Sequence, residues 1–467
     1  MRSHNVEVEC SSLSEPKRFS VIRDAVHGDV YLSYEELAIL DTREMQRLRG
    51  VKQLGTAFLV FPGANHTRFE HSIGTVYVTE QLIKAINFNF DLDPRNNIGL
   101  GEAEARVIRA AALIHDVTHI PYGHNFEDQT GLLARHDSPE RFQSMLSSET
   151  ELGRLLAKQG LLEDVLRILA PKPDDQGTPP FWSQILSDTI CSDLCDYLAR
   201  DAYYTGLNLS VDPRLVNYFK VDRTTGNLYI DLAKRNLLRE DILSEIVRTL
   251  EARYYFSERV YYHHAKVAAG TLVAHAVEIE MAAGVITDRD LFTQTDASLI
   301  ELLDSRATKL PAQDAQRVRS LVERFRNRRL PKRACVYPRY AGEAAQKRLV
   351  ERFFASGKFE QRTKAEQHMS ELVRFSSGID VDVLVTCPAA RMQLKEVETH
   401  VRWPGETSVR PLSDFADRVP RLADLSRAYR ELWKFYVFAD TDDDQVLRKL
   451  QEIAVEEFPG ALNQYSV

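Results

Sequence analysis

The chain has 467 residues, 44% of them hydrophobic, so it can bury a large core, and its length allows about three domains. A formal charge of −8 at pH 7 argues against a nucleic-acid coat protein, because nonspecific phosphate binding needs a broad basic surface. The five scattered cysteines are too few for a disulfide framework, and no stretch has the length of a membrane span. We therefore expect a cytoplasmic protein with no membrane partner and at most a secondary role for nucleic acid.

The N-terminal part of the chain begins with a polar stretch, which is followed by a stretch in which apolar and polar residues alternate. Residues 1–17 are irregular and are predicted to form a mobile arm. Between Phe19 and Leu32 the alternation of apolar and polar residues predicts a short hairpin around His27-Gly28-Asp29. Helical patterns dominate from Ser33 onward, which predicts a mainly α fold with a helical core over residues 18–290.

Two helices carry the first candidate site residues. One opens at Arg68, which shares a helix face with His71 three residues later. The other precedes the pair His115-Asp116 and is expected to continue until Pro121. Apolar residues three, four and seven positions before His115 place this histidine on the inward face. A histidine and an aspartate are costly to bury unless something, usually a metal, binds them.

A third helical stretch completes a candidate metal site. It aligns Asp193, Tyr197 and Asp201 at positions i, i+4 and i+8. The candidate ligands His71, His115, Asp116 and Asp193 form a mixed nitrogen and oxygen set, which suits Fe, Mn, Mg or Zn better than Ca.

The C-terminal part predicts a smaller mixed α+β lobe over residues 291–467. Short strands are expected at residues 381–385, 394–402 and 407–412, before a terminal helix pair that contains Trp433, Phe435 and Tyr436. The basic segment at residues 323–333 is either a solvated helix end or a functional basic patch.

The ligand set carries a resemblance. His71, His115-Asp116 and Asp193 match in order and spacing the H…HD…D signature of the HD-domain metal-dependent phosphohydrolases. Within that superfamily the chain resembles the deoxynucleoside triphosphate triphosphohydrolases, both the bacterial dGTPase-like enzymes and the sterile-alpha-motif/HD-domain enzyme of animal cells. Family motifs are echoed at residues 24–28, 41–42, 46–49, 52–55, 60–64, 68–72 and 196–201.

The resemblance implies an HD-domain core that hydrolyses dNTPs to a deoxynucleoside and triphosphate, with dGTP as a candidate preference. One divalent ion, Mn, Mg, Fe or Zn, is implied at the HD site, with additional Mg accompanying the nucleotide. Matching positions give catalytic residues, with His124 and Glu127 as an acid–base dyad: His119, His124, Glu127 and His136. The matching substrate-binding positions are Gln53, Leu54, Tyr197 and Asp201, and Arg68 beside the first ligand is expected to bind a phosphate oxygen. Arg253 and Lys266, near Tyr262, are further candidates to hold the triphosphate. Leu194 departs from the family, because a phosphate-binding lysine stands there in the animal enzyme.

The resemblance also implies regulation by nucleotide effectors bound between subunits, and hence a homo-oligomer, either a dimer or a tetramer. The matching effector positions are Asp41, Gln46, Arg49, Arg214, Lys234, Arg235, Arg328 and Lys332. Ser20 replaces a lysine of that site, so the identity of the effector does not transfer. The enzyme would serve dNTP pool balance or would deprive invading phage of precursors.

Two other functions remain open at this stage. One is a different HD-domain phosphohydrolase, such as a nucleotide phosphatase or a phosphodiesterase, which shares the ligands without needing the motifs at residues 41–55. The other is a nucleotide-sensing protein that binds without turnover, although its complete ligand set argues against this.

Overall fold

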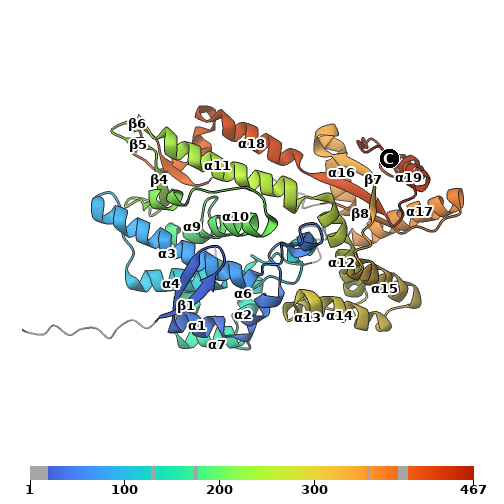
Figure 1. Ribbon diagram of the computed structural model, residues 1–467, viewed down its shortest axis with the longest axis horizontal. Helices are drawn as coiled ribbons and strands as arrows, with labels where there is room; N and C mark the ends of the chain where they lie inside the picture. Colours follow the sequence, from blue (N-terminus) through green and yellow to red (C-terminus); the bar gives the residue numbers. More distant parts are fainter. Residues whose placement is uncertain (1–18, 128–132, 172–176, 355–357, 388–397) are drawn as a thin grey trace, which may run out of the picture.

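The computed structural model describes residues 19–127, 133–171, 177–354, 358–387 and 398–467, and it is mainly helical, as predicted (Figure 1). The predicted arm, residues 1–17, lies outside the described residues. The helices of the first half are α1 (Tyr34–Leu40), α2 (Arg43–Arg47), α3 (Arg68–Leu92), α4 (Glu102–Ile114), α5 (Gly123–Glu127), α6 (Pro139–Met145), α7 (Glu151–Lys158), α8 (Leu162–Leu169), α9 (Pro180–Ser187) and α10 (Ser192–Thr205). Those of the second half are α11 (Glu240–Phe256), α12 (His264–Ala282), α13 (Asp288–Phe292), α14 (Asp296–Arg306), α15 (Ala312–Arg326), α16 (Glu343–Phe353), α17 (Phe359–Ser377), α18 (Pro420–Glu431) and α19 (Asp444–Glu457).

The predicted N-terminal hairpin is confirmed. Strand β1 (Phe19–Asp24) pairs antiparallel with β2 (Gly28–Ser33), and the turn between them contains His27. The strands β3 (Phe219–Val221), β4 (Leu228–Asp231), β9 (His400–Arg402) and β10 (Arg410–Pro411) form a second sheet in the order β10-β9-β4-β3. Because β9 pairs parallel with β4, the C-terminal segment also completes a sheet of the first half. The division at residue 290 stays a prediction.

The long helix α3 lies at the centre of the core, against α4 and α10. It begins with a capping box, in which the Thr67 side chain accepts from the Glu70 backbone while Glu70 binds the Thr67 backbone. That cap fixes where the helix starts, and it therefore fixes the inward direction of His71 one turn later.

The prediction that the second helix continues until Pro121 was wrong, because α4 ends at Ile114. Beyond it, Val117 N–H donates to Ile114 and His119 N–H donates to the Asp116 carbonyl, as in tight turns. The buried guanidinium of Arg47 donates to the carbonyls of Val117 (2.9 Å) and His119 (2.7 Å). These carbonyls are held by a distant arginine, so the turns replace further helix.

The C-terminal sheet has the order β7-β11-β8, built from β7 (Lys332–Pro338), β8 (Val383–Thr386) and β11 (Lys434–Ala439). The strand predicted at residues 381–385 is therefore confirmed as β8, and those at 394–402 and 407–412 are confirmed in part as β9 and β10, with 394–397 outside the described residues. The predicted terminal helix pair around Trp433, Phe435 and Tyr436 was wrong in one respect. Phe435 and Tyr436 lie in β11, the central strand, between α18 and α19, and side chains on both of its faces are buried.

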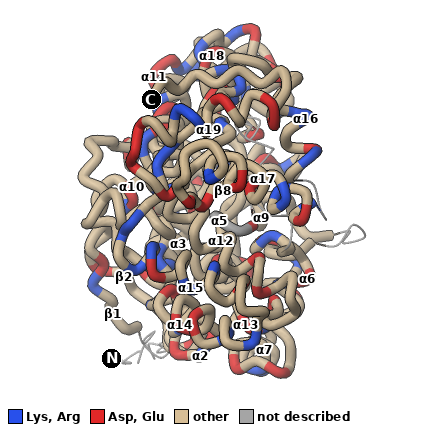
Figure 2. Tube along the Cα trace, turned by 90° about the vertical axis from the view of Figure 1, so that its right-hand side faces the viewer, with Lys and Arg blue, Asp and Glu red and all other residues tan. Residues whose placement is uncertain are grey.

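In the view of Figure 2, Lys and Arg positions are interspersed with Asp and Glu positions along the trace. Among the described residues no helix combines the length and apolar character needed to cross a bilayer. Cys191, Cys335 and Cys387 are buried thiols, as core packing predicts.

One buried carboxyl makes stability depend on pH. Glu280 on α12 is 0% exposed, and neither of its carboxylate oxygens has a hydrogen-bond partner among the described residues. Burial raises its pKa from 4.5 to about 8, although Arg306 opposes the shift. A carboxyl with a raised pKa in the folded state costs stability as pH rises from 4.5 to about 8.

We therefore expect Glu280→Gln to stabilise the protein by on the order of 3 kcal/mol at pH 8 and to have almost no effect near pH 4. Urea unfolding at several pH values measures this difference. Glu456→Gln, on the exposed face of α19, is the control. A gain that does not depend on pH would contradict the assignment.

Candidate metal centre and active site

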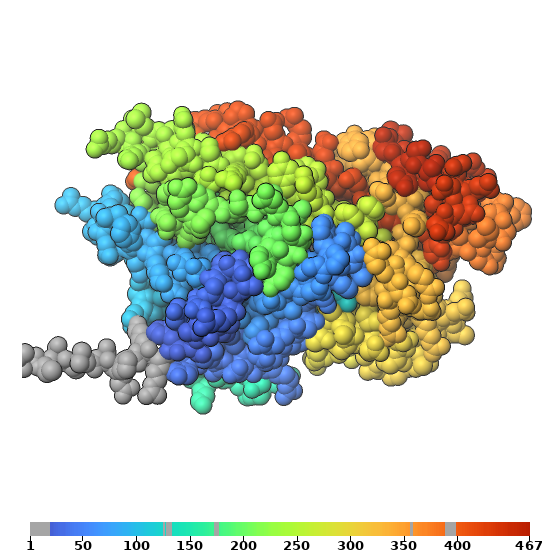
Figure 3. Space-filling model, viewed as in Figure 1, coloured from blue at the N-terminus to red at the C-terminus, as the bar shows by residue number. Residues whose placement is uncertain are grey.

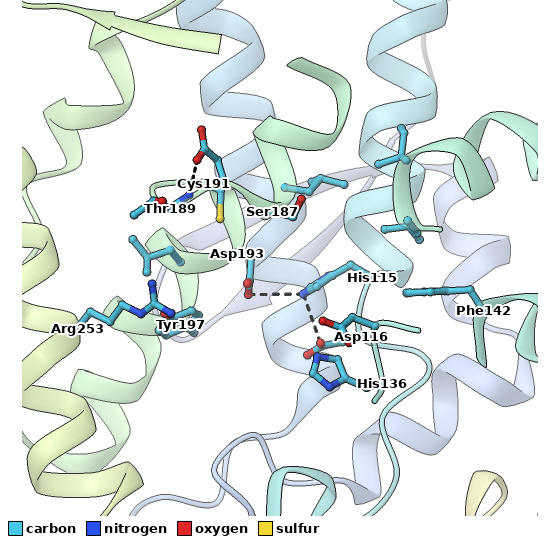
Figure 4. A pocket seen from close by; sticks show the side chains of 16 residues that line it. His115, Asp116, His136, Phe142, Ser187, Thr189, Cys191, Asp193, Tyr197 and Arg253 are labelled. Atoms are coloured by element: carbon cyan, nitrogen blue, oxygen red, sulfur yellow. Dashed lines mark hydrogen bonds and ion pairs between the residues drawn. The ribbon is translucent and has the colours of Figure 1, made fainter. Parts of the chain in front are cut away.

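Three predicted ligands from three helical segments converge on one point. His71 lies on α3, His115 caps α4 and Asp193 lies in the first turn of α10. His71 Nε2 is 2.9 Å from Asp193 Oδ1 and 3.2 Å from His115 Nε2, and His115 Nε2 is 3.6 Å from Asp193 Oδ1. Their ligand atoms all lie within 4.8 Å of one another. Figure 4 shows His115 and Asp193 facing each other across this point.

The hydrogen bonds of the two imidazoles show what this set can hold. His71 Nδ1 is 2.6 Å from Asp196 Oδ2, and His115 Nδ1 is 2.8 Å from the carbonyl of Ala112. Both Nδ1 atoms therefore carry the hydrogen, and both Nε2 lone pairs face the same point. Two lone pairs 3.2 Å apart repel unless a cation lies between them. The donor set fits a divalent metal such as Mn, Fe or Zn.

The fourth predicted ligand, Asp116, lies at the edge of this set. Its Oδ2 is 3.7 Å from His71 Nε2, and its Oδ1 is 3.6 Å from His115 Nε2. Arg68 Nη1 donates to Oδ2 at 2.7 Å, and His119 Nε2 lies 3.1 Å from Oδ1. Arg68 was predicted to bind phosphate, and here it fixes the Asp116 carboxylate beside the metal site.

The electrostatics favour a cation at this point. Burial lowers the pKa of His71, but hydrogen bonds with Asp193 and Asp196 outweigh it and raise that pKa to about 10. Burial raises the pKa of Asp116, but the positive charge of Arg68 holds it well below its usual range. The ionised carboxylates thus attract positive charge, which a metal ion supplies in place of a proton.

A group of three imidazoles lies beside the metal site. The nitrogen atoms of His119, His124 and His136 lie within 4.8 Å of one another, and the rings of His119 and His136 stack with centroids 3.8 Å apart. Burial lowers the pKa of His124 to about 3 and that of His119 well below its usual value. Both of these rings are therefore neutral at pH 7 and can accept a proton or a hydrogen bond.

The structure shows which histidine the predicted acid orients. Glu127 Oε2 is 2.8 Å from His136 Nδ1, while Arg141 Nη1 donates to Glu127 Oε1 at 2.5 Å. The sequence predicted His124 as the partner of Glu127, and this contact makes Glu127 and His136 an acid–imidazole dyad. With Nδ1 bound to the carboxylate, Nε2 of His136 is the nitrogen available for proton transfer.

A cavity of about 250 Å³ opens beside these groups. His115, Asp116, Asp193 and His136 line it, and Tyr197 and Arg253 line it as well (Figure 4). Its remaining wall is largely apolar and includes Phe142, Ile168, Leu169, Leu186 and Leu194. Tyr197 and Arg253, both predicted to bind substrate, thus share one cavity with His115, Asp116, Asp193 and His136.

The other predicted substrate residues are connected to one another. Asp201 accepts from the hydroxyl of Tyr261 at 2.7 Å and lies 2.8 Å from His66 Nε2. Lys266 Nζ donates to the carbonyl of Tyr261, and Tyr262 is the next residue along the chain. Gln53 N–H donates to the carbonyl of His66, and Leu54 is buried in the core. The sequence gave no signal for the connecting role of His66, because the contact spans 135 positions.

The predicted effector residues lie in different parts of the chain. Gln46 accepts from Arg49 and donates to the carbonyl of Leu40, and Asp41 caps α1 beside them. Lys234 and Arg235 lie at the hairpin of β5 (Ala233–Lys234) and β6 (Leu237–Leu238), and Arg214 lies in the preceding 3-10 helix Pro213–Tyr218. Arg328 follows α15, and Lys332 begins β7. Figure 1 shows the β5–β6 hairpin and α15 near opposite ends of the folded molecule. Lys234 and Arg235 are therefore remote from Arg328 and Lys332 within one chain.

Comparison with known families confirms the resemblance. Residues 68–201 match the family model described as the HD domain, and residues 232–457 match the model described as the HD associated region. The HD match begins three residues before His71 and ends at Asp201, so it contains every predicted metal ligand.

Individual proteins are also similar to this chain in sequence. The chain is 30% identical over 292 residues to an uncharacterized protein of Methanocaldococcus jannaschii, covering 61% of this chain and 54% of that protein. It is 28% identical over 351 residues to the deoxynucleoside triphosphate triphosphohydrolase SAMHD1 of Homo sapiens. The match covers 66% of this chain and 54% of that protein. The chain thus spans about half the length of these relatives.

A solved structure shares the fold. The crystal structure of a phosphohydrolase from Bacteroides thetaiotaomicron matches with a TM-score of 0.63 at 19% identity, covering 90% of this chain and all of that one. Together with the converging ligands, these matches show that the chain belongs to the HD-domain phosphohydrolases with an HD-associated region, at a distance from the deoxynucleoside triphosphate triphosphohydrolases.

Proposed function

We propose that this protein hydrolyses deoxynucleoside triphosphates to a deoxynucleoside and triphosphate. The observation that carries the proposal is the cavity that brings Arg253 and Tyr197 together with His115 and Asp193, two members of the candidate metal cluster. The 28% identity to a deoxynucleoside triphosphate triphosphohydrolase supports the choice of substrate. A dGTP preference belongs to the same proposal.

A divalent ion in this site would polarise a phosphoryl oxygen and lower the pKa of water. Side chains of the protein supply ligand positioning, proton transfer and phosphate binding. Arg68 holds the Asp116 carboxylate, and His136, oriented by Glu127, moves a proton at its Nε2. Arg253 offers a guanidinium to phosphate oxygens, and the apolar side chains of the wall limit the access of bulk water other than the attacking molecule.

The charge of the cavity bears on how a triphosphate is held. Among the described residues that line it, Arg253 is the only arginine or lysine, and Asp137 and Asp188 add negative charge. Leu194 adds an apolar surface where the resembled enzyme has a lysine. We infer that Mg accompanying the nucleotide neutralises the rest of the triphosphate.

Regulation belongs to the proposal too. Effector residues that are remote from one another within one chain, such as Lys234 and Arg328, would come together only across subunits, so we propose a homo-oligomer with nucleotide effectors at its interfaces. Mass photometry with and without each nucleotide tests this, and a monomer under every condition would reject it.

The sparse positive charge favours one alternative, a nucleotide phosphatase or phosphodiesterase that takes a less charged ester. A product assay separates the two functions. Purified protein is incubated with each dNTP and Mn²⁺ or Mg²⁺, in the presence of every other NTP or dNTP as effector. Triphosphate as the product supports the proposal, and inorganic phosphate selects the alternative. Nucleotide binding without any product from a dNTP would reject the proposed function.

Replacing Arg253 tests the triphosphate end of the cavity. Arg253→Met is expected to raise KM for the dNTP by about 10–100-fold, because a charge-assisted hydrogen bond to phosphate is lost. Arg253→Lys should recover part of this loss, since it restores the charge without the planar donor pair. Steady-state kinetics measure both variants, and Arg259→Met, an exposed arginine on the following helical turn, is the control. An unchanged KM would place the phosphates elsewhere.

A further inference from the structure

A buried ion cluster behind His71 connects the metal site with the N-terminal hairpin. Asp196 follows the ligand Asp193 by about one turn of α10, and its side chain is fully buried. Its Oδ2 is 2.6 Å from His71 Nδ1, and its Oδ1 is 2.6 Å from His27 Nε2. Arg200 donates to both oxygens, from Nε and from Nη2, each at 2.9 Å. Four contacts from three chain segments therefore hold one carboxylate.

The tip of the hairpin holds the other side of this cluster. Asp24 accepts from Arg200 through both of its oxygens, at 2.8 and 3.1 Å, and it also accepts from backbone N–H groups of its own turn. The turn ends at Gly28 with φ +76°, a left-handed conformation that favours glycine. The ring of His27 stacks on Tyr77 of α3 with centroids 4.7 Å apart. The hairpin is thus fixed on the surface above α3 and α10 (Figure 3).

The backbone of α3 approaches this cluster closely at Gly74. A Cβ atom added there would lie 1.9 Å from Asp196 Oδ1 and 2.2 Å from Arg200 Nη2. Gly74 also lies one turn beyond His71 on the same helix. Because a side chain at this position would displace both buried ions, the arrangement of α3 and α10 depends on the glycine.

We propose that Asp196 is the positioning residue for His71, and that His27 and Asp24 make metal affinity depend on the docking of the hairpin. Because His71 Nδ1 donates to Asp196, its Nε2 is kept as a lone pair aimed at the metal site. If the hairpin moved away, Asp196 would lose the His27 contact, and its Arg200 partner would lose both contacts with Asp24. This inference rests on the metal site of the proposed function and does not depend on its substrate.

The test is Mn²⁺ binding by chelator-treated full-length protein, followed by the electron paramagnetic resonance signal of free Mn²⁺. Asp196→Asn is expected to weaken binding about 10–100-fold, because one amide oxygen cannot replace two carboxylate oxygens. His27→Gln is expected to weaken binding in the same direction and by less. Asp29→Asn, an exposed aspartate on the same hairpin that pairs with Arg23, is the matched control and should bind like wild type.

Two further measurements distinguish a loss of ligand positioning from a loss of folding. Near-ultraviolet circular dichroism confirms that each variant is folded, and excess Mn²⁺ should restore the turnover of His27→Gln to the wild-type kcat. Unchanged Mn²⁺ affinity in folded Asp196→Asn overturns the proposal, and unchanged affinity in His27→Gln overturns the role of the hairpin. If Asp196→Asn does not fold, His27→Gln decides, because its side chain lies at the edge of the cluster and is 13% exposed. Wild type that binds Mn²⁺ but hydrolyses no dNTP would reject the proposed function and leave this inference standing.

Discussion

Replacing His115 with alanine is expected to lower turnover by about 10³-fold or more, while the helical fold persists. The metal supplies several kcal/mol of stabilisation to the transition state, and each 1.36 kcal/mol corresponds to about a factor of ten in rate. His115 provides one of the two imidazole lone pairs that face the metal position, so its loss leaves two close ligands. Its side chain caps α4 rather than filling the helix interior, which limits the structural damage.

Metal content and turnover are measured on the same preparation. His115→Ala should contain little Mn or Fe after dialysis, as determined by inductively coupled plasma mass spectrometry, and its far-ultraviolet circular dichroism should match wild type. His368→Ala, an exposed histidine on α17, should retain both metal and activity. Full activity in His115→Ala would mean that the metal lies elsewhere.

The second large effect is expected at the acid–imidazole dyad. His136→Ala should lower kcat for the dNTP by about 10²–10⁴-fold, the usual contribution of a positioned proton-transfer group. Glu127→Gln should cause a smaller loss in the same direction, because it removes the charge that orients the ring and leaves Arg141 without its buried counter-ion.

A substrate with a good leaving group tests the role of His136. Bis-p-nitrophenyl phosphate releases a nitrophenolate that needs no proton, so His136→Ala should be far less impaired on it than on a dNTP. Metal bound by the His71, His115 and Asp193 group should be unchanged, since His136 does not belong to that group. Equal losses on both substrates would argue against proton donation.

Several features could be predicted from the sequence because they depend on neighbours along the chain. Helical spacing placed His115 on an inward face and aligned Asp193 with Tyr197 and Asp201, and strand alternation predicted the hairpin that carries His27. The order H…HD…D with its flanking motifs was sufficient to predict the family. Each of these signals spans a few turns of helix or one turn of a hairpin, so local patterns contain them.

The tertiary structure alone decided which side chains meet. The sequence predicted His124 as the partner of Glu127, and the fold also brings His136 to this carboxylate, a contact that the sequence did not indicate. The sequence extended α4 to Pro121, but the distant Arg47 holds the carbonyls beyond Ile114 and the helix ends earlier.

The same holds for the cluster behind the metal. His27 and Asp196 are 169 positions apart, and nothing in the spacing of either residue indicates the other. The sequence by itself determined the chemistry of the metal ligands and the helices that carry them. The partners that orient those ligands were decided by packing, because contacts between distant segments depend on how buried apolar surfaces fit together and leave no periodic pattern along the chain.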